Sequence, residues 1–195
     1  MDESKYQNMF LELKPQHTQW GDWCHSPQLY FRGAEEIPGA TYNVGWQIFK
    51  APIHWMEQEP HFHREEEYLV FLGADLFNPD EFDAEIELWM GEDVENMEKH
   101  IITKPTIVRI PPSMWHCPLD FKRVDKPILF QAAYLSGTCG RVTRHVDEDG
   151  NIQFVYGGPE IIHGCRLEPD KKCTYCGKCF RLEHEVNNDG AGPDI

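Results

Sequence analysis

Short segments in which apolar and polar side chains alternate recur along this chain, and no stretch has the apolar spacing of a long helix. The first begins at Thr41, where Tyr42, Val44 and Trp46 alternate with small or polar residues. Further segments with strand character span residues 51–56, 67–72, 84–90, 100–103, 106–110, 128–135, 141–146 and 151–156. Because short strands separated by close turn signals are typical of antiparallel sheets, the sequence predicts an all-β sandwich or barrel.

The length of 195 residues favours one domain with extensions. We expect an irregular N-terminal arm at 1–40, a β-barrel at 41–157 and a cysteine-rich extension at 158–195. Hydrophobic residues make up 41% of the chain, which is typical of a folded protein and not of a disordered one.

A formal net charge of −15 argues against nucleic acid or an anionic membrane as a partner, because binding phosphates requires clustered lysine and arginine. The first residues lack the apolar core of a signal peptide, and no run approaches the roughly 20 apolar residues of a membrane span. We therefore expect a cytoplasmic protein that binds a small molecule, with cysteines that serve as thiols or metal ligands more often than as disulfides.

The stretch from His61 to Glu67 carries the strongest chemical signal. On an extended strand, residues two apart point to the same face, so His61 and His63 present their imidazoles together while Phe62 points away. Glu67 has the same parity. Two imidazoles and one carboxylate can bind a metal ion, whereas the alternative is a surface strand with a chance pair of histidines.

A second stretch, residues 107–116, supplies a further ligand, because a short β-rich run is followed there by a Pro-Pro-Ser turn and His116. Together the two stretches resemble the paired motifs of the cupin superfamily, the first being His-x-His, three residues and Glu, and the second Pro-x-Gly-x-x-His. Three positions depart from the family pattern. Ser113 replaces the usual glycine, and Asp120 replaces a frequent asparagine. Five residues, instead of the usual six, separate Glu67 from Gly73.

The resemblance covers residues 41–135 and implies a jelly-roll barrel, also called a double-stranded β-helix, with four metal ligands: His61, His63, Glu67 and His116. Three neutral imidazoles and one carboxylate leave coordination positions open, which is typical of a catalytic site, since structural zinc sites are usually closed and rich in sulfur. Iron, manganese or nickel suits this ligand set better than zinc.

Several polar or aromatic residues on the predicted strands are candidates for contacting a substrate. The candidates are Arg109, Gln131, Tyr134, Trp115 and His54. Arg109 can clamp a carboxylate through its planar fork, but pairing with a surface acid from an outward strand face is an equal alternative. His54 is read either as a packed or surface histidine or as a residue beside the metal.

The C-terminal extension predicts different chemistry. Four cysteines fall within fifteen positions, and they are Cys165, Cys173, Cys176 and Cys179. Four thiolates suit tetrahedral zinc or an iron–sulfur cluster, and the paired spacing lets one turn present two sulfurs to the same ion. His163 or His184 is an alternative fourth ligand, and ordinary reduced thiols or disulfides remain open.

These observations support a metal-dependent cupin enzyme that acts on a small oxygen-rich organic acid or sugar derivative, as a dioxygenase or an isomerase-like lyase. The alternative is a non-catalytic module that binds or senses a small ligand, and a two-centre redox protein using the cysteines is a third reading. Residues 67–72 are apolar on both faces, which is compatible with a homodimer that covers the outer face.

Overall fold

A computed structural model describes residues 6–17, 21–156 and 160–166, the last segment by its backbone only. The two 3-10 helices are η1 (Gln7–Met9) and η2 (Gly33–Glu35). The strands are β1 (Leu29–Phe31), β2 (Asn43–Phe49), β3 (Ile53–Glu57), β4 (His61–His63), β5 (Glu67–Gly73), β6 (Ala84–Gly91), β7 (Glu98–Ile102), β8 (Thr106–Ile110), β9 (Trp115–Val124), β10 (Ile128–Tyr134), β11 (Arg141–Val146), β12 (Asn151–Tyr156) and β13 (Glu160–Arg166). Within these residues, no helix has the length and apolar character needed to cross a membrane.

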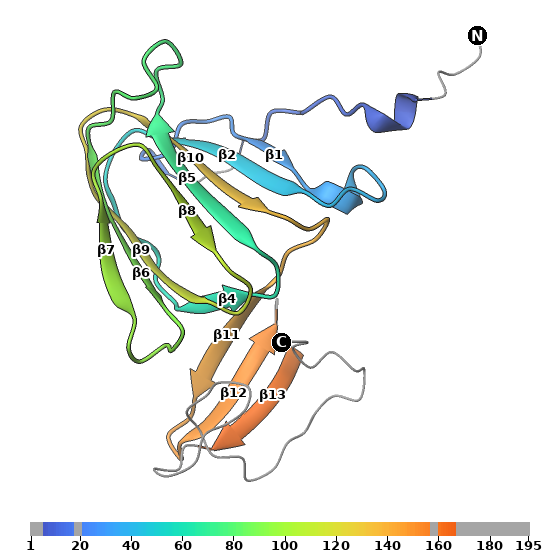
Figure 1. Cartoon of the computed structure of the whole chain (residues 1–195), viewed down its shortest axis with the longest axis vertical. Helices are drawn as coiled ribbons and strands as arrows, with labels where there is room; N and C mark the ends of the chain where they lie inside the picture. Colours follow the sequence, from blue (N-terminus) through green and yellow to red (C-terminus); the bar gives the residue numbers. More distant parts are fainter. Residues whose placement is uncertain (1–5, 18–20, 157–159, 167–195) are drawn as a thin grey trace.

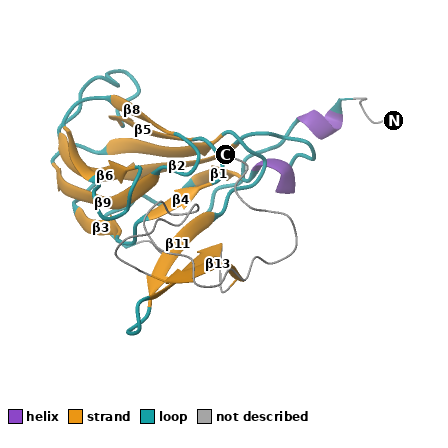
Figure 2. Ribbon diagram, turned by 60° about the horizontal axis from the view of Figure 1, so that its bottom comes forward, coloured by secondary structure: helices purple, strands orange, loops and turns teal. Residues whose placement is uncertain are grey.

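The strands form two antiparallel sheets that face each other across one core (Figures 1 and 2). The smaller sheet has the order β1-β2-β10-β5-β8. The larger sheet has the order β13-β12-β11-β4-β9-β6-β7, and β3 pairs with β9 beside this path. In the middle of each sheet, at β2-β10-β5-β8 and β11-β4-β9-β6, neighbouring strands come from distant parts of the sequence, which is a jelly-roll topology. The predicted all-β fold class is confirmed.

The barrel interior is filled by aromatic and branched side chains from both sheets. Phe49, Phe71, Phe121 and Phe130 lie at its centre, and the rings of Phe49 and Phe121 meet edge to face with centroids 4.5 Å apart. Alternation along each strand accounts for this arrangement, because every second side chain points into the space between the sheets.

Strand β5 follows the predicted parity. Its inward residues, including Glu67, Leu69 and Phe71, are buried, whereas the outward Tyr68 and Val70 are only half-buried. The outer face is therefore partly covered within one chain, and the homodimer stays a prediction.

Strand β9, the longest, was not anticipated from the sequence. Pro118 interrupts it and charged residues crowd its second half, so the apolar alternation survives only at positions such as Leu119 and Phe121. Its ten residues pair with β6 along nearly their whole length, and this pairing is set by tertiary structure rather than by local propensity.

Two strands lie outside residues 41–157, the range predicted for the barrel, and the domain boundaries stay a prediction. Strand β1 lies inside the arm that was predicted to be irregular, and it extends the smaller sheet by pairing with β2. Strand β13 lies beyond the predicted barrel and extends the larger sheet, with the backbone of Cys165 opposite Ile152. Cys173, Cys176 and Cys179 lie outside the described residues, and the predicted second metal site is untested.

Candidate metal centre

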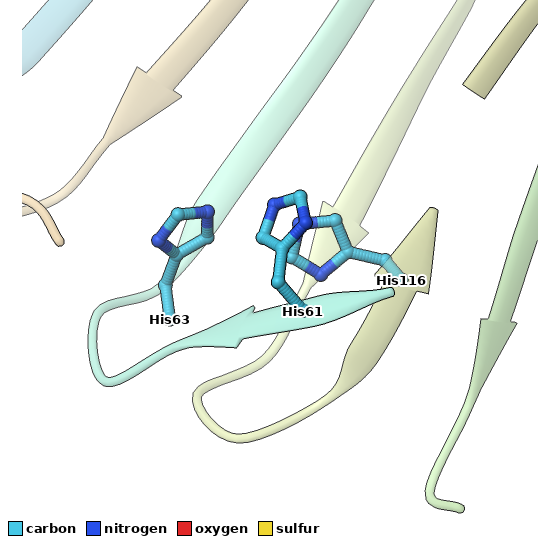
Figure 3. Close-up of side chains that lie close together, drawn as sticks. All are labelled: His61, His63 and His116. Carbon is cyan, nitrogen blue, oxygen red and sulfur yellow. The ribbon is translucent and has the colours of Figure 1, made fainter. Parts of the chain in front are cut away.

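Three histidines from two neighbouring strands converge at one end of the barrel. His61 and His63 lie on β4, and His116 lies directly opposite His61 on β9 (Figure 3). Their ligand nitrogens all lie within 4.8 Å of one another. The rings are almost fully buried, with exposed fractions of 2–5%. The parity argument from the sequence is thus confirmed for the histidine pair.

The opposite faces of the same strands are anchored by a second apolar cluster. Phe62 on β4 and Trp115 on β9 stack edge to face with centroids 4.9 Å apart. They pack on Val142, Ile152 and Phe154 from β11 and β12. Because each histidine is flanked by such an anchor, the backbone that carries the imidazoles is held in place from behind.

The turn before β9 explains the departure at Ser113. Ser113 has φ 64°, in the left-handed region that glycine adopts without strain, and its backbone N–H donates to the His63 carbonyl at 2.8 Å. The position therefore has the backbone conformation that glycine adopts most readily.

Each imidazole is oriented by a backbone carbonyl. The Nδ1 atoms of His61, His63 and His116 lie 2.9, 2.9 and 3.0 Å from the carbonyl oxygens of Glu59, Gly140 and Met114, respectively. A carbonyl only accepts hydrogen bonds, so in the neutral ring Nδ1 carries the proton and Nε2 carries the lone pair. All three lone pairs are then available to a metal, and the carbonyls act as its outer support.

Glu67 completes the set from the start of β5. Its Oε2 atom lies 3.2 Å from His116 Nε2 and 3.6 Å from His63 Nε2. Within the described chain, neither Glu67 Oε2 nor His63 Nε2 has a hydrogen-bond partner, and both are buried. Acceptor atoms brought this close in a dry site repel one another unless a proton or a cation lies between them, so the arrangement fits a bound cation.

The charge states agree with this reading. Burial, together with the neighbouring His116, lowers the pKa of His61 to about 2, and burial also lowers the pKa of His63. Burial by itself favours the neutral Glu67 carboxyl, whereas the hydrogen bond from the Tyr134 hydroxyl favours the ionised carboxylate. Near pH 7, His61 and His63 are therefore neutral imidazoles, the form that binds metals.

A cavity of about 220 Å³ lies against these ligands, between the two sheets. Its walls include Tyr30, Gln47, Leu69, Phe130, Ala132 and Tyr134. The Tyr134 ring stacks edge to face on His63 at 4.9 Å between centroids, and its buried hydroxyl hydrogen-bonds Glu67. Of the four candidate catalytic residues, Tyr134 is the one that the structure places in this cavity.

The other three candidates lie elsewhere, and their assignment to the site is corrected here. Arg109 is 59% exposed on β8 and forms a bidentate pair with Glu66 on the outer surface. Gln131 lies between two residues of β10 that line the cavity, so alternation points it to the opposite face. His54 is 63% exposed on β3, with Nδ1 3.3 Å from Asp120 Oδ1.

Trp115 is not placed to contact a substrate, because it belongs to the apolar cluster behind the histidines. Asp120, at the position of the frequent asparagine, is fully buried and forms an ion pair with Lys122 Nζ at 2.7 Å, and it also contacts His54.

The wall residues that were not found from the sequence include Glu57, Cys117 and Arg141. Cys117 follows His116 directly, and regular alternation would point it away from the cavity. Cys117 has a φ of 68°, and a bulge in β9 sets the three residue steps from His116 to Leu119 opposite the two steps from Met90 to Leu88 in β6. This irregularity brings the side chains of His116 and Cys117 to the same face. Burial raises the pKa of the Cys117 thiol, which keeps it protonated.

Comparisons with known proteins give a likeness in fold. No protein-family model matches the chain, and no curated protein matches it either. Among solved structures, a recombinant oxalate oxidase in complex with glycolate is 14% identical, with a TM-score of 0.48 and coverage of 72% of this chain and 66% of its own. Peruvianin-I, a cysteine peptidase from Thevetia peruviana latex, is 13% identical, with a TM-score of 0.48 and coverage of 71% and 78%. Bacillus subtilis oxalate decarboxylase, studied for its Mn(II) centres, is 11% identical, with a TM-score of 0.44 and coverage of 66% and 30%.

Proposed function

We propose that this chain is a metal-dependent cupin enzyme that acts on a small oxygen-rich organic acid or sugar derivative. The reaction type that we propose is that of a dioxygenase or an isomerase-like lyase. One observation carries the proposal: three imidazoles, each with Nδ1 bonded to a carbonyl, direct their Nε2 lone pairs at one buried point beside a carboxylate and a cavity.

The ligand set supports a divalent transition metal held by His61, His63, Glu67 and His116. We propose iron, manganese or nickel ahead of zinc, because three nitrogen ligands and one oxygen ligand leave room for further ligands in an octahedral shell. When bound, such a metal supplies Lewis-acid stabilisation of negative charge that develops on a substrate oxygen.

The surrounding residues have separate roles in this proposal. Leu69 and Phe130 keep bulk water away from the centre, which strengthens electrostatic interactions there. Tyr134 holds a proton on its hydroxyl, since burial and the nearby Glu67 raise its pKa well above the usual value. It therefore acts as a hydrogen-bond donor to Glu67 and not as a general base.

Metal analysis tests the proposal directly. Protein purified without affinity-tag metals should contain about one transition-metal ion per barrel, measured by elemental analysis. His63→Ala should abolish this binding, because it removes one of the four proposed ligands. Cys176→Ala should spare it, since the barrel ligands are unchanged. Barrel metal that persists in His63→Ala would contradict the ligand assignment.

A non-catalytic ligand-binding or sensor protein is the alternative, and it predicts the same metal and the same cavity. The two are separated by turnover. The loaded protein is incubated aerobically and anaerobically with small oxo and hydroxy acids, and products and oxygen consumption are followed. Saturable binding without any product favours the sensor, whereas oxygen-dependent loss of the acid favours a dioxygenase and oxygen-independent conversion favours a lyase or isomerase.

A further inference from the structure

A bidentate ion pair stands at the cavity, beside the histidines. Arg141, the first residue of β11, donates from Nη1 to Glu57 Oε2 at 2.8 Å and from Nη2 to Glu57 Oε1 at 3.0 Å. Both side chains line the cavity and both reach solvent, with exposed fractions of 46% for Arg141 and 28% for Glu57. The pair thus lies between the interior and the outside.

Arg141 is the one guanidinium or ammonium group among the described residues that line this cavity. A guanidinium has five N–H donors, and the bonds to Glu57 engage one hydrogen on each terminal nitrogen. The Nε–H and one hydrogen on each terminal nitrogen are not used by Glu57. A second carboxylate can accept hydrogen bonds from them.

We infer that Arg141 selects ligands that carry a carboxylate and that Glu57 is an internal competitor for the same guanidinium. The inference rests on the proposed function in one respect, which is that an oxygen atom at the other end of the ligand would face the metal. Arg141 would select negatively charged ligands whatever the type of reaction.

The cavity volume limits the ligand. A volume of about 220 Å³ is smaller than the roughly 300–1,000 Å³ of typical ligand pockets. Together with the need for a carboxylate at Arg141 and an oxygen donor at the histidines, this size points to oxo, hydroxy or dicarboxylic acids of two to four carbons.

Glu57 provides the decisive test, because two readings of the pair predict opposite signs. If Glu57 competes with the ligand carboxylate, Glu57→Gln removes the competing charge and binding tightens. If the pair only ties β3 to β11, Glu57→Gln loosens the cavity wall and binding weakens. Glu57 lies close to His61, so Mn²⁺ affinity is measured for each variant as well.

The experiment uses calorimetry on the full-length protein, in metal-free and Mn²⁺-loaded form. The ligands are pyruvate and malonate, with their uncharged amides pyruvamide and malonamide as matched controls. Arg141→Gln should weaken binding of both acids about tenfold or more, and Arg141→Lys should restore part of it, since the charge remains but the fork is lost. Glu57→Gln should tighten binding of the acids about threefold to tenfold, and none of the changes should alter binding of the amides.

The inference is overturned if neither acid binds in either form, if Arg141→Gln weakens acids and amides equally, or if Glu57→Gln weakens the acids. A protein that takes up none of Mn²⁺, Fe²⁺ and Ni²⁺ but binds the acids with this Arg141 dependence would sustain the inference and refute the proposed metal enzyme. The two failures are therefore told apart in one set of titrations.

Discussion

The metal-free protein should lose stability between about pH 7 and about pH 5 because its buried histidines resist protonation. In the unfolded chain, an imidazole takes up a proton near its ordinary pKa of 6.5, whereas in the folded chain the pKa of His61 is about 2. Over this interval the unfolded state binds more protons than the native state, so the free energy of unfolding falls as the pH falls.

The size of the effect follows from the pKa of His61. Between pH 7 and pH 5, one histidine that titrates only when unfolded costs about 2 kcal/mol, with a slope approaching about 1.4 kcal/mol per pH unit below its ordinary pKa. Burial also lowers the pKa of His63, which adds to the loss. Glu65, whose pKa is raised by burial, acts in the opposite direction at the acidic end.

Urea unfolding in the presence of a chelator, at three pH values across this interval, measures the effect. The expected result is a falling midpoint with an unchanged m-value, because the surface exposed on unfolding stays the same. His61→Gln is the matched variant, and its free energy of unfolding should vary less with pH than that of the wild type. A wild-type stability that is flat or rises toward pH 5 would refute the claim that these imidazoles are buried and neutral.

Three further changes have expected outcomes. Tyr134→Phe should destabilise the protein by about 1 kcal/mol in urea unfolding and weaken Mn²⁺ binding, because Glu67 loses a hydrogen-bond donor; unchanged Mn²⁺ affinity would remove the hydroxyl from the support of the site. Ser113→Gly should be neutral or stabilising by up to about 1 kcal/mol, since relief of the left-handed conformation exceeds the entropy cost of glycine, whereas Ser113→Val should lower the thermal midpoint. Arg109→Ala should leave metal and acid affinities unchanged in calorimetry, because its partner Glu66 lies on the outer surface; a loss of acid binding would return Arg109 to the site.

The pairing of His61 with His63 could be predicted from the sequence because residues on one strand keep their relative parity in any sheet. Glu67 lies on β5 of the other sheet, so parity along one strand does not account for its place beside the histidines, and the fold brings it there. The assignment of His116 rested on the resemblance to the cupin motif, and the structure places it opposite His61. Parity misled at Cys117, where a bulge turns a second side chain into the cavity, and the adjacent Pro118 is the local sign of that bulge.

The sequence by itself determined the all-β class and the face on which His61 and His63 lie. Only the tertiary structure decided what supports them and what the cavity selects. The carbonyl that orients His63 comes from Gly140, 77 positions away, and the pair between Glu57 and Arg141 joins residues 84 positions apart. Contacts over such separations depend on how distant strands are registered across a sheet, and register is set by the packing of the whole barrel, which no short stretch of residues contains.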